Sequence, residues 1–207
     1  MTRSAFLVLI IACGAAVSCA PRLSPEAIAL AEQHRTIAIL PPEVFIESMR
    51  RTTPEDRKRL EKVERGNLQR ELQDWVLRRK AKEGWKIEFL GTHQVNETLR
   101  LDEFENNSLP APTDACRLLG TDAVLVSRFT LRQPMSQALA IALGVLFNTW
   151  GVTNQSFAEL EIHDARTGEV IWRYRNVFSG SAGSNMHMVV ERLMRHASRN
   201  MPYRKFN

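Results

Sequence analysis

Five segments of the chain carry the apolar patterns that are typical of β-strands. They combine β-branched or aromatic residues with polar neighbours, and they are bounded by glycine, proline or polar turns. The segments are Thr36–Leu40, Trp85–Leu90, Ala123–Thr130, Ser156–Ile162 and Glu169–Phe178. Val44–Ile46 would extend the first of them beyond two prolines. The pattern therefore predicts about five strands.

The link between the last two predicted strands, His163–Gly168, is typical of a tight hairpin. Glycine suits the left-handed backbone conformation that such a turn requires, and an aspartate in a turn accepts hydrogen bonds from its own backbone. We therefore expect Asp164 to stabilise this turn.

Helical periodicity fills the spaces between the predicted strands. A long helix is predicted to begin at Thr52 or Thr53, with Pro54 in its first position, and to end at Gly84. Weaker helical character covers Thr98–Asn107. These signals predict one long helix between the first two strands, with only weak helical character after the second.

Two further helices follow from the same reasoning. A short helix over Thr113–Leu119 carries Cys116 and ends at Gly120, and the last helix begins near Ser184. Apolar residues at helical spacing predict one buried face for the last helix. They are Met186, Val189, Val190, Leu193, Met194, Ala197 and Met201.

The order of these elements, β-α-β-α-β-β-β-α, predicts the fold class. It indicates an α/β (α+β) domain in which a single mixed β-sheet of about five strands is covered by helices. We expect this domain to span residues 36–207, with an apolar insertion over 135–152.

The first residues have the pattern of a secretory signal peptide. Arg3 gives a positive start, and the apolar run from Ala5 to Val17 is too short to cross a bilayer as a helix. The run ends in Ala16–Cys19 (Ala-Val-Ser-Cys), which resembles the lipobox of bacterial lipoproteins, whose cysteine is acylated and becomes the new N-terminus.

We therefore predict a signal peptide over residues 1–18 and a lipidated N-terminus with a tether over 19–35. The alternative is ordinary cleavage near Ala20, which would leave a free protein. Ala20 stands where lipoproteins held at the inner membrane of enteric bacteria carry aspartate. This resemblance implies an outer-membrane lipoprotein that faces the periplasm.

Cysteine content and charge limit the remaining possibilities. Cys13 and Cys19 belong to the predicted leader and anchor, so Cys116 is the only cysteine of the predicted domain and no internal disulfide can form. The formal net charge of +5 suits anionic lipid head groups or acidic partners, or serves solubility alone. The predicted compartment excludes nucleic acid as a partner.

The apolar insertion is the most unusual stretch of the predicted domain. It is uncharged from Ala138 to Phe147 and is too short to span a membrane as a helix. An exposed apolar insert between strands indicates a partner or membrane contact, whereas a helix packed on the sheet would be ordinary core. Both readings remain open. The candidate contact residues are Leu139, Ile141, Leu143, Leu146, Phe147 and Trp150.

No catalytic or metal-binding pattern emerges from the rest of the chain. His163 and Asp164 lack the nucleophile motif of a hydrolase, and Cys116 lacks a reactive-cysteine signature. The methionines and histidines of the last helix suggest copper, but methionine on an apolar face fills a core. The loop over Ser179–Ser184 has neither a dinucleotide fingerprint nor a phosphate-binding lysine. We therefore predict no enzyme activity, catalytic residue, metal, cofactor or small-molecule substrate.

Three segments of the sequence together resemble a known family. They are Ile37–Pro42, Leu119–Val126 and the hairpin Ala158–Trp172. They are similar to the periplasmic α/β domain of CsgG-like and LpoB-like bacterial lipoproteins, which is related to the N-terminal domain of TolB. The resemblance covers roughly residues 36–200.

The resemblance implies a non-enzymatic component of an envelope or secretion complex that associates with itself or with another envelope protein. The alternative is a regulator that docks on a cell-wall synthase or another periplasmic enzyme. An envelope hydrolase ranks last. A CsgG-like pore is not expected, because the chain offers no pair of hairpins long enough to cross a membrane.

The predicted lipid anchor can be tested by one substitution. Cys19→Ala removes the thiol that would be acylated, so we expect the protein to leave the membrane fraction. The measurement is membrane fractionation with immunodetection, and Cys116→Ala is the matched control. Unchanged membrane extraction of the Cys19 variant would contradict the anchor.

Overall fold

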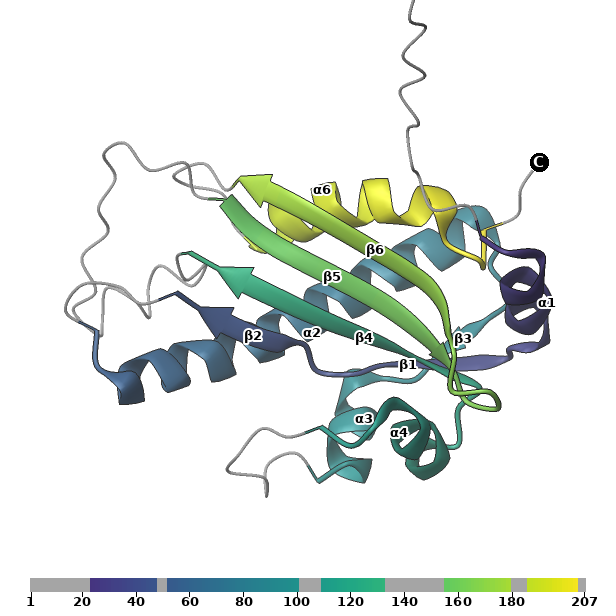
Figure 1. The fold of residues 1–207 in the computed structure, drawn as a ribbon, viewed down its shortest axis with the longest axis horizontal. Coiled ribbons are helices and arrows are strands. Elements are labelled where there is room, and N and C mark those ends of the chain that lie inside the picture. Colours follow the sequence, from purple (N-terminus) through teal and green to yellow (C-terminus); the bar gives the residue numbers. More distant parts are fainter. Residues whose placement is uncertain (1–22, 48–51, 101–108, 133–154, 180–185, 205–207) are drawn as a thin grey trace, which may run out of the picture.

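The computed structural model describes residues 23–47, 52–100, 109–132, 155–179 and 186–204, which form a six-stranded mixed sheet with helices on both faces (Figure 1). The strands are β1 (Thr36–Ile39), β2 (Glu43–Ile46), β3 (Glu88–Phe89), β4 (Ala123–Leu131), β5 (Gln155–Asp164) and β6 (Val170–Ser179). The helices are α1 (Pro25–Gln33), α2 (Pro54–Glu83), α3 (Thr92–Thr98), α4 (Pro112–Leu119) and α6 (Met186–Ala197), followed by a 3-10 turn, η1 (Ser198–Asn200).

β4 lies in the middle of the sheet and pairs with three strands. β1 and β2 follow one another along one side of β4, both parallel to it, and β5 runs antiparallel along the other side. β3 extends the sheet beyond β1, and β6 extends it beyond β5. The break between β1 and β2 falls at Pro41 and Pro42, which lack the N–H groups of a continuous ladder.

A buried glutamine of α2 supports the sheet beside this break. Gln69 Nε2 donates to the carbonyl oxygen of Ile39 at 3.0 Å and to Asn96 Oδ1 at 3.0 Å. Asn96 Nδ2 donates back to Gln69 Oε1 at 3.0 Å. These bonds satisfy polar groups that burial removes from water, and they connect α2, β1 and α3.

The helices cover the two faces of the sheet unequally. α2 and α6 lie behind one face, whereas α3 and α4 lie against one end of the other (Figure 1). The larger core fills the space between the sheet and the first pair, with Leu68, Leu125 and Leu193 fully buried. A smaller cluster, which includes Cys116 and Val124, lies under α3 and α4. The rest of that second face has no described helix over it.

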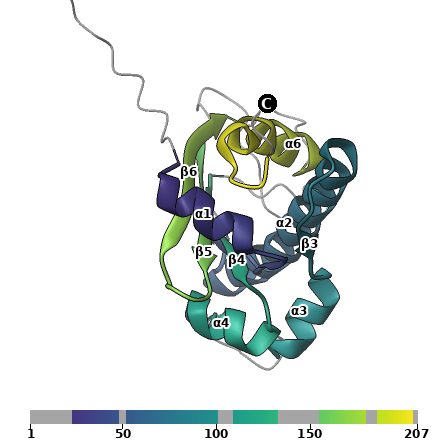
Figure 2. The ribbon, with the colours of Figure 1, turned by 90° about the vertical axis from the view of Figure 1, so that its right-hand side faces the viewer.

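Helix α1 is also part of the domain. It lies beside the start of β6 (Figure 2), and its Ala27 and Ala31 are buried in the larger core. This helix falls within the segment 19–35, for which the sequence predicts a tether.

The expected fold class is confirmed, and six strands replace about five because the extension at Val44–Ile46 belongs to a separate strand, β2. The long helix is capped as predicted, since Asp56 N donates to Thr53 Oγ1 at 3.1 Å and Gly84 adopts a left-handed φ of 66°. The short helix ends at Gly120, also with a left-handed φ. Val190, Leu193, Met194, Ala197 and Met201 are buried, which confirms the predicted apolar face.

Two predicted elements are matched only in part. Helical structure occurs at Thr92–Thr98, before most of the predicted segment Thr98–Asn107, and it ends before Arg100, which has a positive φ of 49°. Residues 101–108 lie outside the described part. The second predicted strand shortens to Glu88–Phe89, where it pairs with β1, although Trp85 and Ile87 are buried. Their apolar character therefore reports core packing rather than strand structure.

Within residues 23–47, 52–100, 109–132, 155–179 and 186–204, no helix combines the length and apolar character that crossing a membrane requires.

The hairpin between β5 and β6 depends on one glycine. Gly168 has a φ of 73°, and a Cβ atom there would lie 3.1 Å from Thr113 Cγ2. We expect Gly168→Ala to lower the free energy of unfolding by about 1–2 kcal/mol, measured by chemical denaturation. The control is Gly91→Ala, because Gly91 has a φ of −64° and open space around it. Equal losses in the two variants would contradict the role of the left-handed turn.

Candidate functional site

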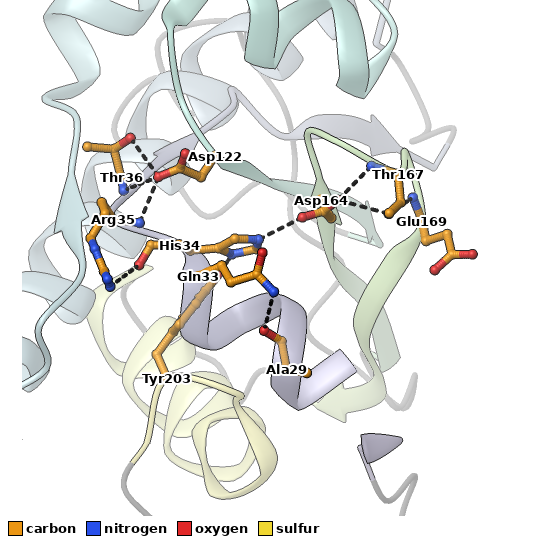
Figure 3. Close-up of polar contacts among 10 residues, drawn as sticks. All are labelled: Ala29, Gln33, His34, Arg35, Thr36, Asp122, Asp164, Thr167, Glu169 and Tyr203. Carbon is orange, nitrogen blue, oxygen red and sulfur yellow. Dashed lines mark hydrogen bonds and ion pairs between the residues drawn. The ribbon is translucent and has the colours of Figure 1, made fainter. Parts of the chain in front are cut away.

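A buried polar cluster connects three distant segments of the chain (Figure 3). His34, which follows α1, lies between Tyr203 near the C-terminus and Asp164 at the end of β5. Its Nδ1 lies 2.8 Å from Tyr203 Oη, and its Nε2 lies 2.9 Å from Asp164 Oδ1. A neutral imidazole satisfies both contacts when Nε2–H donates to the carboxylate and Nδ1 accepts from the tyrosine hydroxyl.

The hairpin turn holds Asp164 in place. Its second carboxylate oxygen, Oδ2, accepts from Thr167 N at 2.7 Å and from Thr167 Oγ1 at 2.8 Å. The expected role of Asp164 in its own turn is therefore confirmed. The bond to His34 adds a second role, because it fastens the turn to the segment between α1 and β1.

Asp122 makes a similar connection at the start of β4. Its Oδ2 accepts from Arg35 N at 2.7 Å, from Thr36 N at 2.9 Å and from Thr36 Oγ1 at 3.3 Å. The carboxylate thus satisfies two backbone N–H groups where the chain enters β1 (Figure 3). This contact also fixes the backbone from which the Arg35 side chain extends.

The electrostatics of the cluster follow from these bonds. Burial alone would raise the pKa of Asp164, but the hydrogen bonds from His34 and Thr167 outweigh it and hold that pKa below its ordinary value of 3.8. Burial alone would also raise the pKa of Asp122. The hydrogen bonds from Arg35 and Thr36 outweigh this effect, so the pKa of Asp122 is lowered as well. Burial, together with these carboxylates, raises the pKa of Tyr203. The cluster therefore favours two charged carboxylates and a protonated tyrosine.

A groove of about 630 Å³ lies beside this cluster. Its walls come from the second half of α1 and the residues after it, from the turn between α2 and β3, and from the C-terminal segment. The lining side chains include three cations, Arg35, Lys86 and Arg204, and one carboxylate, Glu32. His34 and Tyr203 form part of the same wall. The groove is therefore a net basic surface whose walls the polar cluster holds together.

The part of the second sheet face that no described helix covers, which we call the uncovered face, carries a row of alternating charges. Glu43 on β2, Arg128 on β4, Glu159 on β5 and Arg175 on β6 occupy directly paired positions. Arg128 Nε lies 2.8 Å from Glu43 Oε2, and Arg175 Nε pairs with Glu159. Arg173 and Glu161 form a further pair beside them. These charges satisfy one another across the strands.

A second row on the same face is mainly apolar. Phe45, Thr130, Phe157 and Val177 are directly paired across β2, β4, β5 and β6, two residues along each strand from the charged row. Phe45 is 52% exposed and Val177 is 57% exposed. We call these four residues the apolar row. It lies next to the last residues of β4 and the first residues of β5, which flank the segment 133–154.

The described residues also limit the chemistry available. Burial raises the pKa of the Cys116 thiol to about 11, so the thiol stays protonated at neutral pH and is a poor nucleophile. Among the described residues, no three histidine, cysteine, aspartate or glutamate side chains gather as a metal site would require. His187, considered as a copper ligand, lies 3.0 Å from Glu71 Oε2 on α2.

The contact residues proposed from the sequence lie outside the described part of the chain. Those residues are Leu139, Ile141, Leu143, Leu146, Phe147 and Trp150, and the predicted lipidation site Cys19 also lies outside it. Sequence reasoning missed His34, Tyr203 and the apolar row. His34 and Tyr203 are 169 positions apart, so no local pattern relates them. The apolar row depends on strand register, which no local pattern specifies. Its members do lie in predicted strand segments or, in the case of Phe45, in the predicted extension.

Comparison with known proteins gives likenesses of fold only. No family model matches the chain, and no curated protein matches it. The chain is similar to the solved structure of lipoprotein GNA1162 from Neisseria meningitidis, with 14% identity and a TM-score of 0.44 over 80% of this chain and 98% of that one. It is also similar to the LpoB C-terminal domain from Salmonella enterica, with 10% identity and a TM-score of 0.37 over 75% and 94%.

A PelC dodecamer from Paraburkholderia phytofirmans is a third similar structure, with 12% identity and a TM-score of 0.36 over 84% of this chain and 89% of that one. The expected resemblance to the LpoB domain thus has a counterpart among solved structures. The resemblance to CsgG and TolB stays a prediction. With TM-scores below 0.5, none of these likenesses carries an argument about function.

The polar cluster predicts a specific dependence of stability on pH. We expect Asp164→Asn to lower the free energy of unfolding at neutral pH by about 1–3 kcal/mol, because a charged partner of His34 and Thr167 is lost. The folded-state pKa of Asp164 is lowered, so its stabilising contribution is present above the unfolded value and is lost as pH falls through the folded value.

The difference between the wild-type protein and the Asp164 variant should therefore narrow as the pH falls below about 4, measured by urea denaturation at a series of pH values. Asp74→Asn is the control, since Asp74 is exposed on α2. A difference between Asp164→Asn and wild type that stays constant to the lowest pH would contradict the assignment.

Proposed function

We propose that this protein is a membrane-anchored, non-enzymatic interaction component of a bacterial envelope complex. The observation that carries the proposal is the apolar row on the uncovered face of the sheet. Phe45 and Val177 expose about half of their surface at two strands that lie on opposite sides of β4 and β5. Exposed apolar residues gathered in this way are typical of a surface that another protein covers.

The charged row beside it supports the same reading. Glu43, Arg128, Glu159 and Arg175 are paired with one another, so a partner that covers this face does not bury an isolated charge. Burying an unpaired charge would cost far more than burying a satisfied one. The two rows together form a surface with an apolar strip and a polar margin, which is the usual anatomy of a protein interface.

The apolar insertion extends this proposal. The segment 133–154 connects the ends of β4 and β5 that flank the apolar row. We therefore propose that Leu139, Ile141, Leu143, Leu146, Phe147 and Trp150 contribute to the same contact surface, with self-association as the first expectation. The anchor in this proposal is the acylated Cys19, and the membrane is the outer membrane.

The alternative function is regulation of a cell-wall synthase or another periplasmic enzyme by docking on it. This function uses the same surface, so the identity of the partner decides between the two. A monomeric protein that captures one synthase would favour the alternative. Adducts between two copies of the chain would favour assembly.

Photo-crosslinking in living cells tests the proposed surface. A photoreactive amino acid placed at Val177 on the apolar row, or at Phe147 in the insertion, should give protein adducts that mass spectrometry identifies. Leu118 is the matched control, because it is apolar and 52% exposed but lies on α4. We expect Phe45→Asp to reduce the Val177 adducts at least about fivefold, which corresponds to roughly 1 kcal/mol of lost contact.

Equal adducts at Leu118 and Val177 would contradict a specific surface. Adducts with lipid alone would contradict a protein partner at this face. Absence of adducts at both Val177 and Phe147 would remove the proposed contact site.

A further inference from the structure

We propose that the basic groove beside α1 binds phosphate groups of anionic phospholipids in the membrane that holds the protein. The proposal rests on the proposed lipidation of Cys19. It assigns a ligand class to a site at the opposite end of the domain from the apolar row. The cations that would bind phosphate are Arg35, Lys86 and Arg204.

The ion pairing of these cations supports the proposal. Some other cations of the sheet and helices do form ion pairs, as Arg128 does with Glu43 and Arg79 with Glu83. Lys86 and Arg204 have no acidic partner within the described part of the chain. Among the described residues, the hydrogen bonds of Arg35 Nη1 go to the backbone oxygens of Glu32 and His34, at 3.4 and 3.5 Å.

The composition of the groove gives the second argument. Three cations and one carboxylate line it, so it attracts anions despite Glu32. A guanidinium presents a planar fork of donors that matches phosphate oxygens, and an ammonium adds a compact charge. The polar cluster behind the wall is already satisfied, because Asp164 and Asp122 both accept hydrogen bonds from protein groups. Among the described residues, these two carboxylates therefore do not occupy the cations of the groove.

The position of the anchor gives the third argument. Pro25 begins α1, and an extended chain spans about 3.3–3.6 Å per residue. The first residue of α1 therefore lies within roughly 20 Å of an acylated Cys19. The groove is formed by the same helix, by the residues after α2 and by the C-terminal segment, which gather at one end of the molecule (Figures 1 and 2). A tether this short keeps that end at the lipid surface.

The charge of the membrane then determines the orientation. Each lysine or arginine near an anionic surface contributes attraction that corresponds to roughly a fivefold increase in binding. Three such residues on one end are sufficient to favour the orientation in which the groove faces the lipid. The apolar row on the far end of the sheet then faces the periplasm.

Hydrogen–deuterium exchange of the lipidated protein tests this inference. The protein is purified from its own membranes and reconstituted into nanodiscs of phosphatidylcholine, or of phosphatidylcholine mixed with phosphatidylglycerol. We expect amides around Lys86 and Arg204 to exchange at least about fivefold more slowly in the anionic discs, and high salt to reduce that protection. The double variant Lys86→Glu with Arg204→Glu should lose the protection.

Lys58→Glu is the matched control, because Lys58 is an exposed lysine near the other end of α2. This variant should keep the protection. Protection that is equal in neutral and anionic discs, or that survives in the double variant, would overturn the proposal. The same protection of detergent-solubilised protein by inorganic phosphate would also overturn it, because the ligand would then be free phosphate.

The anchor is tested separately by the intact mass of the purified protein. A mass without acyl chains would show that the proposed lipidation is wrong. Anionic vesicles added to that free protein would then test whether the groove binds phospholipid. Slower exchange that is lost in the double variant would support phospholipid binding, and unchanged exchange would overturn it.

Discussion

The carboxylate of Asp164 is the contact on which the arrangement of this domain depends most directly. One oxygen closes the turn between β5 and β6 through Thr167, and the other holds His34. His34 in turn contacts Tyr203, so the segment after α1, the hairpin and the C-terminal segment meet at one point. Since His34 and Tyr203 line the basic groove, a local turn of the sequence supports a surface to which distant segments of the chain contribute. The depressed pKa of Asp164 reflects the same bonds.

Strand register determines the second surface. Moving one strand by a single residue would turn Phe45 or Val177 toward the core and expose a core residue instead. The antiparallel pairing of β4, β5 and β6 instead aligns Arg128, Glu159 and Arg175 in one row, and Thr130, Phe157 and Val177 in the next. The uncovered face therefore combines satisfied ion pairs with an apolar row, which favours recognition by another protein.

Local signals made much of the fold predictable. Thr53, Pro54 and Gly84 mark the ends of α2 because capping and left-handed termination depend on neighbouring residues alone. The hairpin followed from its glycine and aspartate in the same way. The polar cluster could not be predicted, because His34 and Tyr203 have no local relation to Asp164. Trp85 and Ile87 looked like strand residues because a sequence pattern reports burial without revealing which backbone pairs. The predicted lipid anchor and the apolar insertion lie outside the described residues and stay predictions.

The 30 residues of α2 have a consequence for the reach of the protein. Near its start, Glu61 Oε1 accepts from Ile46 N of β2 at 2.9 Å, whereas Gly84 after its end lines the groove. A helix rises 1.5 Å per residue, so these two points are separated by roughly 35 Å of continuous helix. If the groove lies on the lipid surface, this helix acts as a fixed spacer. It then sets the height above the lipid at which a partner binds the far end of the domain. Any insertion into α2 would change both that height and, by about 100° per residue, the direction in which the far end faces.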